Sequence, residues 1–153
     1  MVTGAAGFIG SHLVDYLLSK GNTVIGLDNL SNGTMRNLKN ASDNKSFSFI
    51  KSDILNLEDC INSCKNVDIV YHLACLGVRH SLHNPIENHK VNAEGTLNML
   101  EASRKNSVKQ FFYISTSEVY GKGDQFPISE TALPVPITVY GSSKLVGEHY
   151  TNS

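Results

Sequence analysis

The chain has 153 residues, of which 41% are hydrophobic and 18% charged, and its formal net charge is −1. This length suits one domain with one core. The near-neutral charge gives no sign of a surface for nucleic acid or anionic membranes. Three cysteines without CxxC spacing argue against a disulfide framework or a zinc site, and no apolar run nears the roughly 20 residues that span a bilayer. We therefore expect a cytoplasmic protein.

Short β-rich runs alternate with helical patterns along the chain, which is typical of βαβ units and a parallel sheet. Apolar residues at helical spacing between Phe8 and Leu18 predict a helix, Gly21 its C-terminal cap, and residues 24–27 a buried strand. The later elements that we expect are strands at residues 47–50, 67–73 and 110–115, and helices at residues 56–64, at residues 85–105 and from Thr138 onward.

Glycines recur in Thr3-Gly4-Ala5-Ala6-Gly7-Phe8-Ile9-Gly10, between a short first strand and the first helix. Glycines allow a tight turn and let the backbone approach a pyrophosphate, while the N–H groups and the dipole of a helix N-terminus hold the anion. The spacing is GxxGxxG rather than GxGxxG, so a glycine-rich turn without a ligand remains an alternative.

Asp28 ends the second strand 18 residues after Gly10, close to the roughly 20-residue offset of the acid that binds adenosine ribose. A carboxylate there accepts hydrogen bonds from ribose hydroxyls and repels a 2′-phosphate. Because Asn29 follows where an NADP enzyme often has Arg, NAD is favoured over NADP, with Arg36 keeping NADP as a minor alternative. Asp28 also suits the simpler role of opening a turn.

Tyr140 and Lys144 stand four residues apart, so a helix places the phenol and the ammonium on one face. A neighbouring cation stabilises a phenolate, and we therefore expect Lys144 to lower the pKa of Tyr140 and make it a base near neutral pH. A YxxxK pair is also common on solvated helix faces. Its place after the fifth strand is what favours a functional pair.

Residues 77–83 are expected to form a loop that contains Arg79, His80 and His83, with His89 further on. The histidines lack a carboxylate or cysteine partner at ligand spacing, so we predict no metal site. Arg79 suits a contact with a sugar diphosphate, and a solvated loop residue is the equal alternative.

These motifs, together with YHLAC at residues 71–75 and STSEVYG at residues 115–121, resemble the extended short-chain dehydrogenase/reductase family, of the NAD-dependent nucleotide-sugar epimerase/dehydratase type. The resemblance covers nearly the whole chain, and the order and spacing of the motifs carry it. It implies a Rossmann-type doubly wound parallel sheet, NAD as cofactor, nucleotide-sugar substrates and a homodimer formed through the two long helices.

The resemblance also implies roles for individual residues. It assigns Gly4, Gly7 and Gly10 to the cofactor pyrophosphate, with Phe8 and Ile9 beside them. Asp28 and Asn29 are assigned to the adenosine ribose, and Asp53 and Ile54 to adenine. Leu73 and Ala74 are assigned to the nicotinamide side. The catalytic set is Tyr140 as base, Thr116 as hydroxyl partner, Lys144 and Glu118. Tyr140 and Lys144 are also assigned to the cofactor, Lys144 at the nicotinamide ribose, and the substrate contacts are Ser117, Glu118 and Arg79. Cys75 replaces the usual alanine, and no catalytic cysteine is implied. Without the other motifs, Asp53 would be a turn-opening residue and Thr116 an ordinary strand residue.

The implied reaction begins when Tyr140, assisted by Thr116, removes the proton of a sugar hydroxyl while a hydride passes from the same carbon to NAD. We expect UDP-sugar 4-epimerisation. Dehydratases of the family carry Asp-Glu where this chain has Ser117-Glu118, so the missing aspartate disfavours dehydration. The Ser-Glu pair resembles that of UDP-glucuronate decarboxylases, and decarboxylation is therefore the first alternative. A dinucleotide-binding module without turnover is the second.

The family begins several residues before Met1 and continues after Ser153 into a substrate domain. We therefore expect residues 1–153 to form a partial NAD-binding Rossmann domain, incomplete at both ends, whose first strand lies centrally in the sheet. From these residues alone we expect a compromised core, weak cofactor binding and negligible turnover.

Overall fold

The computed structural model describes residues 1–123 and 125–153. Within them, five parallel strands form one sheet in the order β3-β2-β1-β4-β5. The strands are β1 (Val2–Thr3), β2 (Val24–Asp28), β3 (Phe47–Lys51), β4 (Ile69–His72) and β5 (Gln110–Tyr113). The strand order reverses at β1, and this places a crevice at the carboxyl ends of β1 and β4. The predicted Rossmann-type α/β fold is confirmed.

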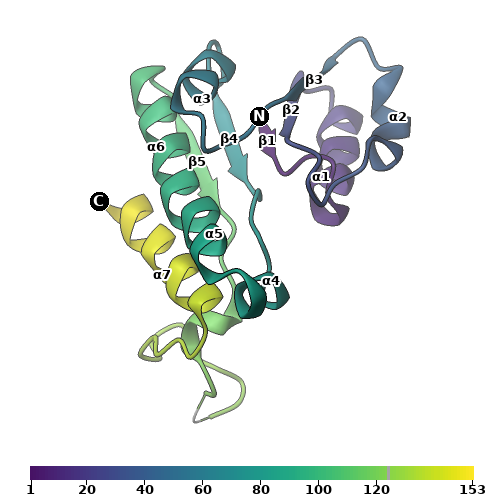
Figure 1. The fold of residues 1–153 in the computed structure, drawn as a ribbon. Coiled ribbons are helices and arrows are strands. Elements are labelled where there is room, and N and C mark those ends of the chain that lie inside the picture. The colour runs from purple at the N-terminus through teal and green to yellow at the C-terminus, as the bar shows by residue number, and fades with distance from the viewer. Residues whose placement is uncertain (124) are drawn as a thin grey trace.

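Helices cover both faces of this sheet (Figure 1). One face carries α1 (Phe8–Ser19), η1 (Met35–Leu38) and α2 (Lys39–Ser42), and the other carries α3 (Leu57–Ser63), α6 (Gly95–Lys105) and α7 (Val139–Asn152). Successive strand residues point to opposite faces, so Met1 belongs to the core under α3 and α6, and Val2 to the core under α1 and α2. β1 lies centrally, as predicted, because it pairs with both β2 and β4.

The long helices begin and end near the predicted residues because polar side chains and glycine cap them. Asn56 accepts hydrogen bonds from the first amides of α3, and Thr138 accepts one from Gly141 N at 2.9 Å in α7. Gly21 follows α1 with φ +79°, as expected of a glycine after a helix. The helix predicted at residues 85–105 is continuous and consists of α5 (Pro85–His89), the π-helical turn η2 (Lys90–Glu94) and α6.

The predicted loop at residues 77–83 is wrong, because these residues form the short helix α4 (Val78–His83). Gly77 is its N-cap, no glycine or proline interrupts it, and Asn84 ends it and caps α5 by accepting from Glu87 N at 3.3 Å. The turns η1, α2 and η3 (Ser117–Tyr120) were not predicted, since four residues are too few to show helical periodicity. No helix in the described part of the chain is long and apolar enough to cross a membrane.

His72 lies fully buried between the sheet and α6, where it joins two threonines. Thr3 Oγ1 already accepts two backbone N–H groups, so it donates to His72 Nδ1 at 2.8 Å. Thr96 Oγ1 donates to Asn92 O, so it accepts from His72 Nε2 at 3.1 Å. These bonds define a neutral imidazole protonated at Nε2. Burial, with the charge of Lys144 adding to it, lowers the pKa of His72 to about 3.

Candidate functional site

The turn between β1 and α1 brings backbone rather than side chains to the crevice. Gly4 has φ +67°, and a Cβ on it would lie 2.8 Å from Ala74 N; a Cβ on Gly10 would overlap Gly4 O. Gly7 is the N-cap of α1, and no described side chain caps this helix, so its first N–H groups face the crevice without a side-chain acceptor. This glycine turn has the form that holds a pyrophosphate.

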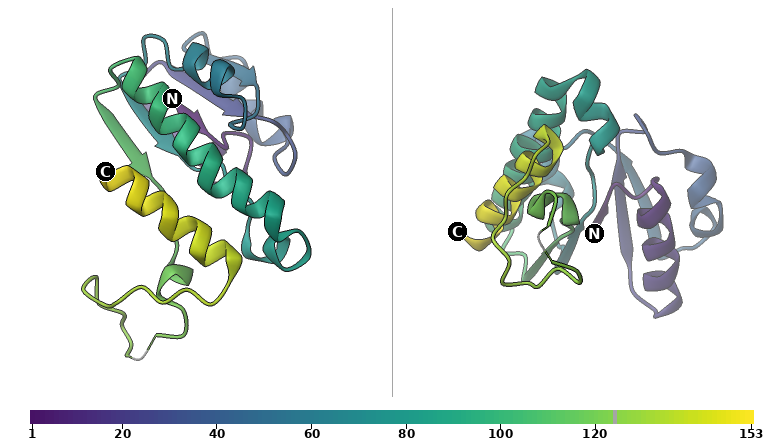
Figure 2. Two further views of the ribbon diagram at one scale, coloured as in Figure 1. Left: turned by 60° about the vertical axis from the view of Figure 1, so that its left-hand side comes forward. Right: turned by 90° about the horizontal axis from the view of Figure 1, so that it is seen from below.

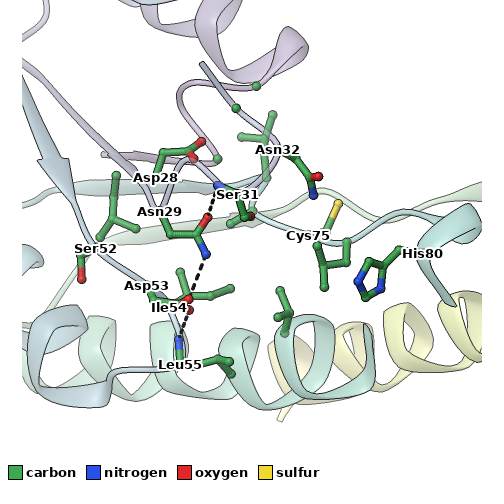
Figure 3. A pocket seen from close by; sticks show the side chains of 18 of the residues that line it. Asp28, Asn29, Ser31, Asn32, Ser52, Asp53, Ile54, Leu55, Cys75 and His80 are labelled. Carbon is green, nitrogen blue, oxygen red and sulfur yellow. Dashed lines mark hydrogen bonds between the residues drawn. The ribbon is translucent and has the colours of Figure 1, made fainter. Parts of the chain in front are cut away.

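A pocket of about 470 Å³ lies at the carboxyl ends of β1, β2, β3 and β4 (Figure 3). Most of the residues predicted to contact a cofactor line it: Gly4, Gly7, Phe8, Asp28, Asn29, Asp53, Ile54, Leu73 and Ala74. Gly10 lies behind it, buried against Gly4, and the side chain of Ile9 is 64% exposed and outside the lining. The predicted catalytic and substrate residues also lie outside this lining.

Asp28 connects the end of β2 to the glycine turn. Its Oδ2 accepts from Ala6 N at 2.9 Å and its Oδ1 from Leu30 N at 2.7 Å, and the residue is only 8% exposed. The bond to Leu30 is the turn-opening role, and the place of Asp28 in the pocket lining leaves its carboxylate open to a ligand as well. Each carboxylate oxygen keeps a further lone pair for a ribose hydroxyl.

Asn29 joins the ends of β2 and β3, because its Nδ2 donates to Asp53 Oδ2 at 2.9 Å (Figure 3). The loop after β2 also returns to the glycine turn, where Ala6 O accepts from Thr34 N at 3.0 Å and from Asn37 Nδ2 at 2.8 Å. These bonds fix the walls of the pocket. The sequence did not predict four further lining residues on these loops: Ser31, Asn32, Gly33 and Ser52. The one feature of the sequence that could have indicated them is their position soon after the end of a strand.

The far wall of the pocket comes from the short helices. His80 on α4 and Glu87 on α5 line it, with His80 Nε2 3.2 Å from Glu87 Oε2. Arg79 is exposed on α4 and does not line the pocket. Within the described residues, no group of three or more histidine, cysteine or acidic side chains is arranged to hold a metal ion.

Tyr140 lies in the first turn of α7, next to η3. A Cβ on Gly141 would lie 2.7 Å from Glu118 O, so the small residue lets α7 approach η3 closely. Burial raises the pKa of Tyr140, Cys75 and Glu118 act in the same direction, and the hydroxyl of Thr116 lowers it. Thr116 caps η3 by accepting from Glu118 N, so both residues lie on the turn that the first turn of α7 approaches.

Lys144 lies one turn further along α7, and it is 2% exposed. Its Nζ donates to Ile114 O at 2.6 Å and lies 4.1 Å from the centre of the Tyr113 ring. Burial lowers the pKa of Lys144, while Cys75 and Glu148 raise it. The predicted lowering of the Tyr140 pKa by Lys144 is wrong in this structure, because the ammonium bonds to the strand end and burial raises the Tyr140 pKa.

Cys75 connects the two parts of the site. It lines the pocket beside His80 (Figure 3), and it follows β4, the strand that pairs with β5, whose end binds Lys144 through Ile114 O. The pocket and the Tyr140 region are therefore neighbours at the same edge of the sheet. A parallel sheet, a glycine turn before a helix and an acidic residue at the end of the second strand define a Rossmann-type domain, the architecture that holds dinucleotides.

Comparison with known proteins gives the family. The GDP-mannose 4,6-dehydratase family matches residues 1–153. The chain is 39% identical to a UDP-glucose 4-epimerase of Mycolicibacterium smegmatis, over 99% of this chain and 50% of that protein. It is 42% identical to UDP-glucuronic acid decarboxylase 2 of Arabidopsis thaliana, over 86% of this chain and 28% of that protein.

A solved structure agrees with these matches. The crystal structure of UDP-glucuronic acid 4-epimerase from Bacillus cereus, in complex with UDP-glucuronic acid and NAD, is 40% identical with a TM-score of 0.90, over 99% of this chain and 50% of that one. The chain belongs to the NAD-dependent epimerase/dehydratase family of nucleotide-sugar enzymes. It spans half the length or less of the relatives named here.

Proposed function

We propose that the protein carrying this chain is an NAD-dependent nucleotide-sugar epimerase that inverts UDP-sugars at C4, with residues 1–153 as its NAD-binding domain. The observation that carries the proposal is the closeness of two strand ends: Cys75 lines the pocket just after β4, and on the neighbouring β5 the strand end binds Lys144 through Ile114 O. A cofactor held in the pocket would thereby lie beside the strand end and helix that carry Thr116, Tyr140 and Lys144. The membership of the family supports the same reaction class.

The pocket residues fit NAD. The glycine turn and the first N–H groups of α1 would hold the pyrophosphate, and the free lone pairs of Asp28 the adenosine ribose. Asp53 and Ile54 would border adenine, and Leu73 and Ala74 the nicotinamide side. The carboxylate of Asp28 would repel a 2′-phosphate, which favours NAD over NADP. When bound, NAD supplies the acceptor for a hydride from the sugar.

The residues around α7 would handle the proton. Tyr140 would accept it from the sugar hydroxyl, and a pKa raised by burial makes the phenolate a stronger base once it forms. The Thr116 hydroxyl would stabilise that phenolate, since it already lowers the Tyr140 pKa. Lys144 uses one of its three N–H donors on Ile114 O, which leaves donors for the nicotinamide ribose.

The substrate contacts proposed for Ser117, Glu118 and Arg79 rest on weaker geometry. The backbone of Glu118 lies against Gly141, next to Tyr140 on α7, so Glu118 would be near the reacting hydroxyl. Arg79 is exposed beyond the pocket, where it would meet the diphosphate. A homodimer through α5, α6 and α7 is consistent with the exposed apolar side chains of Ile86, Leu97 and Tyr150, and light scattering of the purified protein tests it.

UDP-glucuronate decarboxylation is the second candidate, because Ser117-Glu118 resembles that subgroup and the chain is 42% identical to one decarboxylase. UDP-glucuronate separates the two activities. An epimerase leaves the mass of the sugar nucleotide unchanged, whereas a decarboxylase releases carbon dioxide. A loss of about 44 mass units from the sugar nucleotide, which is one carbon dioxide, would replace the first proposal with the second.

The test of Tyr140 uses Tyr140→Phe in the complete protein that carries this chain, with UDP-glucose and NAD. We expect turnover to fall by about 10²- to 10⁴-fold, the usual contribution of a general base, while NAD affinity by calorimetry stays within about twofold, because the phenol does not line the pocket. Tyr150→Phe, further along α7 and exposed, is the matched control and should keep full activity. Unchanged turnover in Tyr140→Phe would remove Tyr140 from its role. Tight NAD binding without any conversion by the wild type would support the binding module instead.

A further inference from the structure

Three successive residues at the end of β5 are bound to α7. Tyr113 Oη donates to Lys144 O at 3.2 Å, Ile114 O accepts from Lys144 Nζ at 2.6 Å, and Ser115 Oγ donates to Glu148 Oε1. The next residue along the chain is Thr116, which caps η3 by accepting from Glu118 N at 3.3 Å. The strand end that carries Thr116 is thus tied to the helix that carries Tyr140 and Lys144.

The helix and the strand also approach each other closely. A Cβ on Gly147 would overlap Tyr113 Oη, so the glycine leaves room for the Tyr113 ring against α7. α7 runs alongside α6 with β5 behind it (Figure 2), and α7 is in contact with both α6 and β5. Tyr140, Lys144 and Glu148 are spaced by four residues, so they follow one side of the helix over two turns.

The Ser115–Glu148 contact lies where a charge is needed. A buried ammonium requires a compensating partner, and among residues 1–123 and 125–153 the direct contacts of Lys144 are a neutral carbonyl and an aromatic ring. Two groups raise its pKa against the effect of burial: Cys75, from the loop after β4, and Glu148, on its own helix. His72 on β4 also faces Lys144, and it is neutral.

We propose that Glu148, held by Ser115, is a positioning residue that fixes the Lys144 ammonium and the end of β5 around Tyr140. Its carboxylate does two separable things. The hydrogen bond from Ser115 sets the distance between the third turn of α7 and the strand end, and the negative charge opposes the lowering of the Lys144 pKa by burial. The inference deepens the proposed function, on which its catalytic consequence rests.

Two variants separate these effects. Glu148→Gln keeps the shape and an oxygen for the Ser115 hydroxyl but removes the charge; Ser115→Ala keeps the charge but removes the hydrogen bond. Ser115→Thr, which retains the hydroxyl, is the rescue variant. Glu101→Gln is the matched control, because Glu101 pairs with Arg104 on its own helix, α6. Among the described residues, Glu101 has no hydrogen bond or ion pair to α7.

The first readout is independent of any activity: the titration of Lys144 in the 153-residue chain, followed by NMR of lysine labelled at the ε-carbon. We expect Glu148→Gln to move the Lys144 midpoint to lower pH and Glu101→Gln to leave it in place. The second readout is turnover of UDP-glucose by the complete protein. Ser115→Ala and Glu148→Gln should lower kcat by about ten- to hundredfold, the effect of a small misplacement, with KM within about twofold and Ser115→Thr near wild type.

These readouts distinguish a failed inference from a failed proposed function. If the wild type converts no nucleotide sugar, the proposed function fails, and a shifted Lys144 midpoint in Glu148→Gln still supports the electrostatic effect of Glu148 on Lys144. An unchanged Lys144 midpoint in Glu148→Gln overturns the inference. So does a kcat in Ser115→Ala equal to that of the wild type.

Discussion

Acid should destabilise this fold through His72. The folded pKa of His72 is about 3, because burial disfavours the imidazolium, whereas the unfolded chain titrates near the ordinary value of 6.5. The folded value lies below the unfolded one, so the stability contributed by neutral His72 is complete above pH 6.5 and is lost as the pH falls toward 3. Each pH unit in this window costs about 1.4 kcal/mol. Between pH 7.5 and pH 5 the free energy of unfolding should therefore fall by about 2 kcal/mol from this group alone.

Thermal or urea unfolding at several pH values measures this loss. For a chain of this length, 2 kcal/mol corresponds to a Tm decrease of about 4–8 °C. His72→Gln keeps an amide donor and acceptor but cannot titrate, so the extra pH dependence should vanish in this variant. His83→Gln, at an exposed position, should retain it. Equal slopes for the wild type and His72→Gln between pH 5 and 7.5 would refute the reasoning, as would a His72 imidazole that titrates near the ordinary value of 6.5 in the folded protein.

Two further substitutions test the pocket. Asp28→Asn places an N–H group where the carboxylate accepts two backbone amides, and it should weaken NAD binding by about tenfold or more. Calorimetry measures the NAD affinity of this variant beside that of the exposed control Asp43→Asn. Equal NAD affinities of the two variants would contradict the assignment of Asp28. Gly10→Ala drives a methyl group onto Gly4 O and should abolish NAD binding. Gly21→Ala is the control: it adds a methyl group in open space at φ +79°, so it should cost about 1–2 kcal/mol of stability while NAD binding survives. If Gly21→Ala lost NAD binding as much as Gly10→Ala, the loss in Gly10→Ala would not come from the glycine turn.

Features with a period or a cap were predictable from the sequence. The helices at residues 85–105 and after Thr138 carry enough turns to show their apolar side, and the strand before Asp28 is apolar throughout. The offset between Gly10 and Asp28 also indicated that Asp28 belongs with the glycine turn, where it accepts from Ala6 N, because a helix between two parallel strands returns the chain to the same edge of the sheet. The pocket residues at the ends of β2 and β4 follow from that topology.

Features that depend on burial or on distant partners were not predictable. The expectation that Lys144 lowers the pKa of Tyr140 rested on spacing alone, and the sequence does not reveal that Ile114 O takes the ammonium or that the phenol is half-buried. The Asp28 bond to Ala6 and the His72 bond to Thr3 join residues far apart in sequence for the same reason. α4 was missed because six residues show no full hydrophobic period.

The most direct test of the account follows the hydrogen at C4 of the sugar. The complete protein is incubated with NAD and UDP-glucose in deuterium oxide, and the product is analysed by mass spectrometry and NMR. If the hydrogen leaves C4 as a hydride and returns to it, the account predicts UDP-galactose without deuterium at C4. Deuterium at C4 of the product, or no UDP-galactose despite saturating NAD, would contradict it.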